Sequence, residues 1–187
     1  MTLEQGSRKI RDQIGDVALR LFAERGYQQV SLADIALAAG LPLDEVTRQV
    51  HNKESLILGA SAHSPLWILD QFQAAPKGAD SRLTLQKILV ERISMFPEDK
   101  LRMWRAAARE IPQDLHDLTR LGVIERASLV AMVAERMGVD QKSDPRPSAL
   151  VSSVIGAVGQ AYEIWLHQKS EKPLLELIEG EFASLDH

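Results

Sequence analysis

The chain has 187 residues, of which 45% are hydrophobic and 26% charged, so it can bury a sizeable core and is too apolar to be disordered. It contains no cysteine, which excludes disulfides, thiolate metal sites and a cysteine nucleophile, and which fits a reducing, cytoplasmic compartment. The formal net charge of −4 gives no overall attraction to nucleic acid, so any DNA-binding surface must be a local one.

The first fifty residues predict three short helices. The first helix is expected to present one apolar stripe, formed by Ile10, Ile14, Val17, Ala18, Leu21 and Phe22. Gly26 is a typical helix stop, and Ser31 can cap a second helix that ends at Gly40. Val46 and Val50, four residues apart, give a third helix a narrow apolar seam.

The rest of the chain also shows helical spacing of apolar residues. The expected helices span 54–72 with a break or kink at Pro65, then 83–95, 100–111, 113–137, 148–169 and 173–185. No segment shows the alternation typical of a strand. The sequence therefore predicts an all-α fold of about nine helices.

Neither a signal peptide nor a membrane span is expected. The N-terminal residues MTLEQGSRKIRDQIGD lack an apolar core. The most membrane-like stretch, residues 148–166, is interrupted by serines, by Gln160 and by Glu163. We expect it to be a buried helix.

Three residues have the spacing of a helix-turn-helix. Ala36 is small enough for two helices to cross closely, Gly40 suits the turn, and Val46 supplies an apolar contact on the following helix. The helix from about Leu43 is then the candidate reader of a DNA major groove. Taken alone, these positions also fit a plain structural hairpin.

The flanking residues extend this pattern. The stretch ALRLFAERGYQQVSLADIALAAGLPLDEVTRQVHNKESLI resembles the N-terminal domain of the TetR family of transcriptional repressors. The positions that carry the resemblance are Leu21, Phe22, Gly26, Tyr27, Ser31, Ile35, Ala36, Ala39, Gly40, Lys53, Glu54 and Leu56. It implies a three-helix DNA-binding domain over residues 1–55. It also implies a helical domain over 56–187 that binds a small molecule and dimerises, with ligand binding lowering operator affinity.

The third helix departs from the family pattern. Thr47 replaces the usual tyrosine, Gln49 and Val50 replace aromatic residues, and Pro42 stands where a serine or threonine cap is usual. A carboxylate from the first turn, Asp44 or Glu45, is therefore expected to interact with the exposed amides there. As an alternative role, Glu45 could accept a hydrogen bond from a cytosine amino group.

The residues expected to contact DNA lie at the start of the second helix and around the third: Ser31, Leu43, Glu45, Thr47, Arg48, Gln49, His51 and Lys53. Arg8, Lys9 and Arg11, expected before the first helix, could add phosphate contacts. Residues 1–60 hold seven Lys and Arg against eight Asp and Glu, hence −1. One DNA-binding domain, which we call the head, should therefore bind DNA weakly and with strong salt dependence.

The last two predicted helices are strongly apolar. In the family such a pair forms the dimer interface, and by that resemblance the interface candidates are Val154, Val158, Tyr162, Trp165, Leu174 and Ile178. The alternative is that the two helices only close the core of a monomer.

Large aromatic and thioether side chains in the middle of the chain are candidates for an apolar ligand pocket: Trp67, Phe72, Met95, Met103, Trp104 and Met132. Simple core packing is the alternative for each. The segment 112–185 also resembles the C-terminal domain of actinobacterial TetR regulators thought to bind acyl-coenzyme A-like ligands. In that case Arg102, Arg105 and Arg109 could meet an anionic head group, unless they are solvated surface.

Nothing in the sequence indicates an enzyme, a metal or a cofactor. It has no glycine-rich phosphate loop, and its five histidines are scattered without ligand spacing. His116 and Asp117 are best explained as surface polar residues.

The sequence thus predicts a cytoplasmic, homodimeric repressor that a small apolar or amphipathic effector releases from its double-stranded DNA operator. The alternative is a helical ligand-binding or protein-interaction module whose DNA-reading surface has degenerated.

Overall fold

The computed structural model describes residues 3–50, 53, 56, 65–108, 121–167 and 172–185. The regular structure in these residues is entirely helical, with nine α-helices and one short 3-10 helix. The predicted all-α class is confirmed. The chain divides into two compact units, Met1–Ala62 with Phe96–His116, and His63–Met95 with Asp117–His187.

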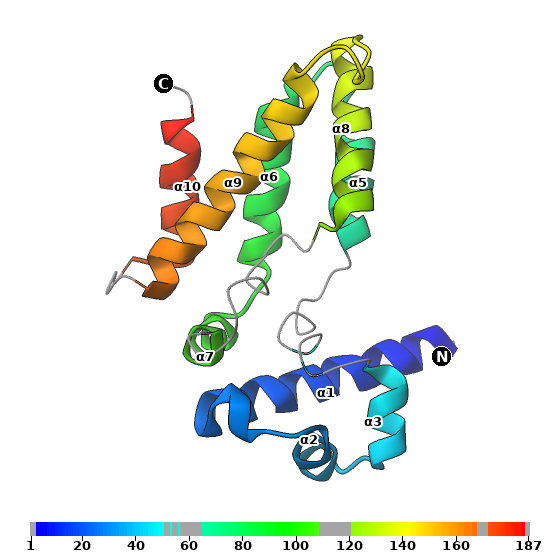
Figure 1. Ribbon diagram of the computed structural model, residues 1–187, viewed down its shortest axis with the longest axis vertical. Coiled ribbons are helices and arrows are strands. Elements are labelled where there is room, and N and C mark those ends of the chain that lie inside the picture. Colours follow the sequence, from blue (N-terminus) through cyan, green and yellow to red (C-terminus); the bar gives the residue numbers. More distant parts are fainter. Residues whose placement is uncertain are drawn as a thin grey trace. The chain divides into compact units, whose positions relative to one another are not determined.

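The first unit is built on one long helix. Its elements are α1 (Leu3–Arg25), η1 (Tyr27–Gln29), α2 (Leu32–Ala39), α3 (Leu43–Gln49) and α7 (Glu98–Ala108). Helix α1 packs against α2, α3 and α7, and it buries Ile14, Ala18 and Phe22 almost completely. Because α1 begins at Leu3, Lys9 and Arg11 lie within this helix and not before it. Figure 1 shows α2 and α3 on one side of α1.

The second unit is a set of packed helices. Its elements are α5 (Pro65–Ala74), α6 (Ser81–Ser94), α8 (Val123–Met137), α9 (Arg146–His167) and α10 (Leu174–Ser184). Helix α9 packs against α6, α8 and α10, while α5 packs against α6 and α8 (Figure 1). Pro65 is the first residue of α5, and residues 57–64, which precede the predicted break or kink, lie outside the described part of the chain.

One arginine ties two of these helices together. The Arg136 guanidinium on α8 lies 4.4 Å from the centroid of the Phe72 ring on α5. It also donates to the carbonyl oxygens of Phe72, Ala75 at 2.8 Å and Pro76 at 3.3 Å. The carbonyls of Phe72 and Ala75 lie at the end of α5, where no further helical turn donates amide hydrogens to them, so the cation satisfies acceptors that the helix leaves open.

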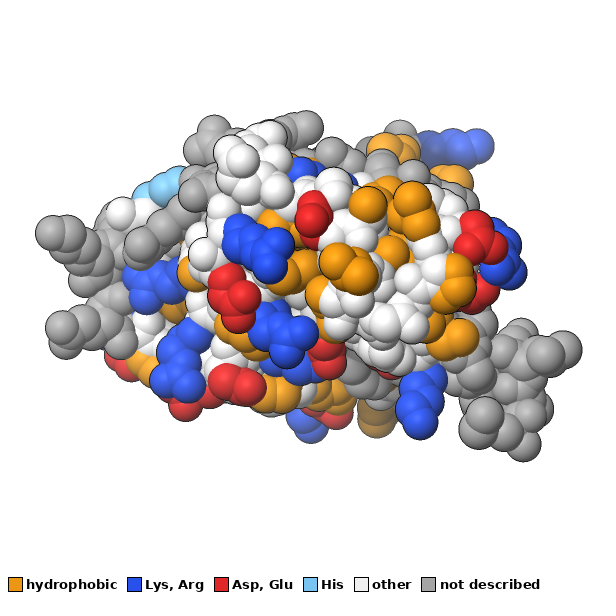
Figure 2. Space-filling model, turned by 90° about the horizontal axis from the view of Figure 1, so that it is seen from below, with side chains coloured by type: hydrophobic (Ala, Val, Ile, Leu, Met, Phe, Trp, Pro, Cys, Tyr) orange, Lys and Arg blue, Asp and Glu red, His pale blue; other side chains and the backbone are white. Residues whose placement is uncertain are grey.

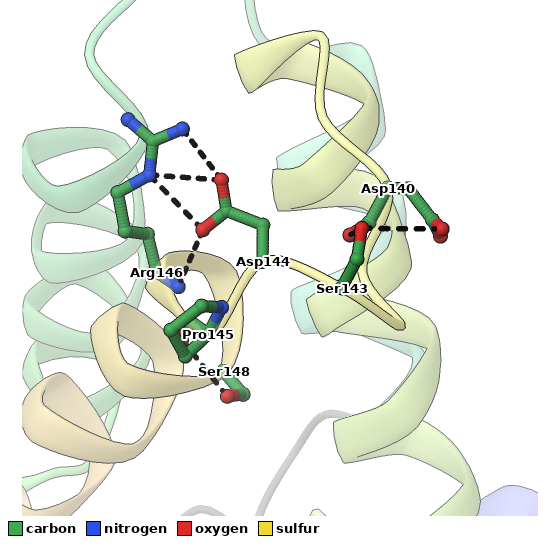
Figure 3. Close-up of polar contacts among 6 residues, drawn as sticks. All are labelled: Asp140, Ser143, Asp144, Pro145, Arg146 and Ser148. Carbon is green, nitrogen blue, oxygen red and sulfur yellow. Dashed lines mark hydrogen bonds and ion pairs between the residues drawn. The ribbon is translucent and has the colours of Figure 1, made fainter.

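The turn before α9 is held by its own side chains (Figure 3). The Asp144 carboxylate accepts hydrogen bonds from the Arg146 backbone amide at 2.9 Å and from the Arg146 guanidinium at 2.5 Å. These hydrogen bonds lower the pKa of Asp144 below its ordinary value. Pro145 follows Asp144, and its carbonyl accepts a bond from the Ser148 hydroxyl at 3.0 Å.

One predicted helix is shorter than expected. Residues 113–137 were expected to form a single helix, but Leu121 and Gly122 are not helical and α8 begins at Val123. Gly122 precedes α8 in an extended conformation, with ψ of 179°. Residues 109–120 lie outside the described part of the chain.

Helix α9 has the length and hydropathy of a membrane span, with a mean hydropathy of 1.3. It is the one described helix that does. Half of its most apolar window is buried inside the subunit, against α6, α8 and α10. This confirms the expectation of a buried helix.

Candidate nucleic-acid interface

Helices α2 and α3 form a helix-turn-helix. Ala36 is 4% exposed and Val46 is fully buried, so both sit in the contact between the helices. Gly40 has φ of +66°, and its amide donates to Leu37 while the Leu41 amide donates to Ala36 at 3.0 Å. This is the left-handed helix end that favours glycine. Ala36 and Val46 are thus buried on either side of a glycine turn.

Helix α1 fixes the end of α2. The Gln13 side-chain amide donates to the carbonyl oxygen of Ala39 at 3.0 Å. This bond satisfies a carbonyl in the last turn of α2, next to the glycine turn. The turn is therefore held from both its own backbone and the helix behind it.

The start of α2 is a reciprocal cap. The Asp34 amide donates to the Ser31 hydroxyl oxygen at 3.1 Å, and the Ser31 amide donates to the Asp34 carboxylate at 2.9 Å. Hydrogen bonds from the Ser31 hydroxyl and amide lower the pKa of Asp34, and nearby Arg25 adds to this. Sequence reasoning identified Ser31 but missed Asp34, although a serine followed three residues later by an acid is a capping signature.

The polar side chains of α3 pair with one another. The Arg48 guanidinium lies 3.2 Å from the Asp44 carboxylate and 2.7 Å from that of Glu45. The Gln49 amide donates to Glu45 at 3.1 Å, and the Thr47 hydroxyl donates to the Asp44 carbonyl at 3.1 Å. In these contacts the two carboxylates meet side chains of the next turn and not the amides of the first.

Lys53 is held inside the head. Its ammonium donates to the carbonyl oxygens of Tyr27 at 2.7 Å and Val30 at 3.0 Å, and it lies 4.0 Å from the centroid of the Tyr27 ring. Tyr27 is buried and contacts Phe22 edge to face at 5.2 Å. Lys53 thus closes the turn between α1 and α2. His51, which was also expected to contact DNA, lies outside the described residues.

The outer surface of α2 and α3 carries an apolar patch. Leu37 is 84% exposed and Leu43 is 46% exposed. We call the α2–α3 patch the exposed apolar residues Ala33, Leu37, Ala38, Pro42 and Leu43. Figure 2 views the protein from the side on which α2 and α3 lie in Figure 1, and it shows hydrophobic side chains gathered between charged ones. Sequence reasoning named Leu43 but missed Leu37, which the periodicity of α2 places opposite its buried residues.

The remaining DNA-contact candidates differ in exposure. Leu43, Thr47 and Arg48 are exposed on α3, whereas Glu45 and Gln49 are half-buried. The exposed cations on α1 are Lys9, Arg11, Arg20 and Arg25.

The six pocket candidates are divided between the two units. Phe72 is fully buried on α5 of the second unit, where Trp67 on the same helix and Met132 on α8 are half-buried. Met95 follows α6 and is 37% exposed. Met103 and Trp104 lie on α7 in the first unit. There the ring of Trp104 stacks on that of Phe96, with 6.3 Å between the ring centroids.

A groove of about 510 Å³ runs along the end of α5 and the outer side of α6. Its lining includes Gln71, Ala75, Leu83 and Lys87. None of the six pocket candidates lines it.

The arginine helix is only partly described. Arg102 on α7 is exposed and Arg105 is half-buried, while Arg109 lies outside the described residues. Among the residues that the structure describes, no group of three His, Asp or Glu could hold a metal ion.

The six interface candidates are buried in the subunit itself. None is more than 5% exposed, and the set comprises Val154, Val158, Tyr162, Trp165, Leu174 and Ile178. Burial raises the pKa of Tyr162 above its ordinary value, with a smaller contribution from Glu163. The outward face of α9 is instead formed by small and polar residues, Ser148, Ser152, Gly156, Gly159 and Gln160.

Two families match separate parts of the chain. Residues 14–59 match the bacterial regulatory proteins of the tetR family, and residues 116–187 match the MftR C-terminal domain. The chain is 29% identical over 163 residues to MftR of Mycobacterium tuberculosis, a protein assigned to transcriptional regulation of mycofactocin biosynthesis. The match covers 84% of this chain and 80% of that protein.

Solved structures share the fold. A transcriptional regulator from Aquifex aeolicus VF5 is similar with a TM-score of 0.58 and 18% identity, over 95% of this chain and 98% of that one. NalD of Pseudomonas aeruginosa, the secondary repressor of the MexAB-OprM multidrug efflux pump, has a TM-score of 0.57 and 20% identity over 96% of both chains. The fatty acid degradation regulator FadR of Bacillus halodurans has a TM-score of 0.57 and 18% identity, over 94% of this chain and 93% of that one.

Proposed function

Because the chain belongs to the TetR family of transcriptional regulators, we propose that it represses transcription by binding a double-stranded DNA operator through α2 and α3. In this proposal residues 1–55 bind DNA, and residues 56–187 bind an effector and dimerise. This functional division differs from the two compact units, since α7 packs on α1.

The observation that carries the proposal is the turn at Gly40. It directs α3 so that Val46 faces the interior while Leu43, Thr47 and Arg48 face outward. A second helix held this way is the element that enters the major groove in helix-turn-helix proteins. The outward residues of α3 are therefore the DNA-contacting set, with Leu43 and Thr47 facing the bases and Glu45 and Gln49 at its edge.

Arg48 is the phosphate contact that we expect on α3. Its guanidinium and the Asp44 carboxylate are 66% and 77% exposed, and an exposed ion pair contributes at most about 1 kcal/mol. A phosphate can therefore compete for Arg48. The bonds of Lys53 to two carbonyls are partly buried, so Lys53 supports the head from within.

Residues 1–60 carry a net charge of −1, so a single head should bind DNA weakly and two heads are needed. Linking two modest binding modules raises the overall affinity because the second contact becomes intramolecular. A two-fold dimer would also place two copies of α3 on half-sites about one helical turn apart.

We place the dimer interface on the outward faces of α9 and α10. Gly156 and Gly159 on α9 and Gly180 on α10 are exposed within helices, and a Cβ atom at any of them would meet nothing in the subunit within 4 Å. Each such glycine costs about 1 kcal/mol relative to alanine in a helix interior. Nothing within the subunit offsets this cost, whereas close approach of a second copy would. The buried interface candidates then support this face from behind.

For the effector we propose a small apolar or amphipathic molecule bound between helices of the second unit. Trp67 and Met132 lie on the contacting helices α5 and α8 and are half-buried. Half-buried aromatic and thioether side chains suit an apolar ligand. A long-chain fatty acid and its coenzyme A thioester, added to a preformed DNA complex, separate the options. Release by both supports an apolar site, and release by the thioester alone would show that the coenzyme A head group is also needed.

The proposed function is tested by capturing genomic fragments with the full-length protein at low and high salt. We expect the dimer to retain a few sequences selectively and to lose them steeply as salt rises. Retention without sequence preference would contradict the proposal.

A module with a degenerate DNA-reading surface is the second candidate function. It is supported by the internal pairing of Ser31, Arg48 and Lys53, all of which were expected to contact DNA. It predicts no selective retention at any salt concentration, together with ligand binding to the second unit.

We place the protein in the cytoplasm, where its DNA target lies. The buried setting of α9 supports this placement, because its most membrane-like segment is used for packing inside the subunit.

A further inference from the structure

We propose that Leu43 reads the methyl group of a thymine, so that the operator holds a thymine at a fixed place in each half-site. This inference rests on the proposed DNA binding. It goes further by naming the residue and the atom of the base that decide specificity.

The first step is the position of Leu43. It lies on α3 one turn before Thr47, and its side chain is 46% exposed although it is large and apolar. Val46, which is fully buried, follows Leu43 by three residues, so Leu43 stands at the border of the buried face, and the exposure of Leu43 and Thr47 places them on the outward side of α3. That side faces the bases if α3 enters a major groove.

The second step is the state of the polar groups beside Leu43. The Thr47 hydroxyl donates its hydrogen to the Asp44 carbonyl at 3.1 Å. The methyl group of Thr47 is the other group that this side chain can offer to a base. Arg48 is paired with Asp44 and Glu45, and the Gln49 amide donates to Glu45. Of the usual donors to guanine and adenine, Arg48 is assigned to a phosphate and Gln49 is half-buried, whereas Leu43 and Thr47 are exposed.

The third step is the chemistry of the groove. In the major groove the four base pairs differ in hydrogen-bond donors and acceptors, and the thymine C5 methyl is the apolar group that distinguishes a T·A pair. An exposed leucine gains by covering that methyl and repels no phosphate. The α2–α3 patch continues this apolar surface through Pro42 to Leu37.

The experiment uses the full-length protein and duplexes selected by it from a randomised library. In the most enriched duplex each thymine is replaced, one at a time, by deoxyuridine, which lacks only the methyl group. We expect the dissociation constant to rise about fourfold at one position of each half-site and to stay unchanged elsewhere, which corresponds to the burial of one methyl group.

The variant Leu43→Ala should bind the thymine and the deoxyuridine duplex equally well, because its contact with the methyl group is gone. Leu83→Ala is the matched control, since Leu83 is an exposed leucine on α6 at 59% and lies outside the head. It should keep the full sensitivity to deoxyuridine.

Three outcomes would overturn the inference. Selective binding that tolerates deoxyuridine at every position, or a Leu43→Ala protein that keeps the wild-type sensitivity, would overturn the reading of thymine while leaving DNA binding intact. Failure to enrich any sequence would overturn the proposed function as well.

Discussion

Several polar residues of the head bond to other groups of the same head. Ser31 and Asp34 cap α2, Lys53 closes the turn before it, and Arg48 pairs with the carboxylates of its own helix. These bonds differ in strength, because exposed ion pairs contribute little and bonds from a partly buried cation contribute more. We therefore expect a residue held by a weak, exposed ion pair to be available to DNA, and a residue held by partly buried bonds to stay within the head.

Ser31→Ala should lower the free energy of unfolding by about 1 kcal/mol, because it removes the acceptor for the Asp34 amide. Ser31→Thr, which keeps the hydroxyl, is the control. Denaturant unfolding at neutral pH measures both. Equal stability of Ser31→Ala and the wild type would show that the cap does not contribute.

The same cap predicts a pH dependence. Hydrogen bonds lower the pKa of Asp34 in the folded state, so its contribution is fully present above the ordinary pKa of about 3.9 and is lost as the pH falls through the lowered value. Asp34→Asn should remove this acid-sensitive part of the stability. Unfolding curves of both proteins between neutral pH and pH 3 test it, and parallel losses would contradict the assignment.

Lys53→Met should lower the free energy of unfolding by about 2 kcal/mol, since two carbonyls lose a charged donor. It should leave the salt dependence of DNA binding unchanged. Arg48→Ala should have the opposite pattern, with near wild-type stability and a salt slope reduced by about 1. Measuring affinity against salt for both variants checks this, and a reduced slope for Lys53→Met would place Lys53 on a phosphate.

At the scale of elements, helix α3 carries two carboxylates that repel phosphate. Asp44 is exposed and Glu45 is half-buried, and both hold Arg48. In the proposed DNA complex we expect them to reduce the general affinity for DNA and to leave apolar contacts to decide sequence preference.

Asp44→Asn should therefore raise the affinity for random DNA several-fold at low salt. It should also lower the ratio of the affinity for selected sequences to the affinity for random DNA. The control is Asp70→Asn, which removes an exposed carboxylate from α5. Competition binding against random DNA measures the effect. An unchanged affinity for random DNA would mean that Asp44 does not face phosphates.

The elements that sequence predicted well are those with local signals. Ala36, Gly40 and Val46 identified the turn because a left-handed glycine and two buried contacts leave a fixed spacing. The start of α8 was missed, since a helical pattern of apolar residues continues across the non-helical Gly122. The start of α1 was also placed too late, because its first turns lack an apolar stripe.

Side-chain pairing was harder to predict than the helices. Sequence placed Lys53 and Arg48 together as phosphate contacts, yet Lys53 bonds to carbonyls 23 and 26 residues earlier in the chain. Such long-range bonds depend on the tertiary fold. Likewise, the apolar residues of α9 assigned to the dimer interface are buried within the subunit, and their spacing in sequence did not distinguish the two kinds of burial.

At the scale of the whole molecule, we expect two subunits to pair. Gly156 and Gly159 leave a flat strip on α9 that is not needed inside one subunit. We expect a second copy to lie against this strip, which would bring two heads to one operator.

Gly156→Arg should dissociate the dimer and abolish operator binding without unfolding the subunit, because nothing in the subunit lies within 4 Å of the new Cβ. Gly78→Arg, at another glycine with no neighbour within 4 Å, is the control and should stay dimeric. Sedimentation velocity and circular dichroism measure assembly and folding. A dimeric Gly156→Arg protein would move the interface elsewhere.

The central claim is that the outward face of α3 lies in a DNA groove, and the absence of cysteine from the chain allows a direct test. A cleavage reagent can be attached to a single cysteine introduced by Thr47→Cys on α3, or by Gln73→Cys on α5 as a control, since both positions are exposed. With Thr47→Cys we predict DNA cleavage in two clusters about one helical turn, or a multiple of it, apart. Absence of cleavage from Thr47→Cys in a stable complex, or a pattern equal to that of Gln73→Cys, would contradict the account.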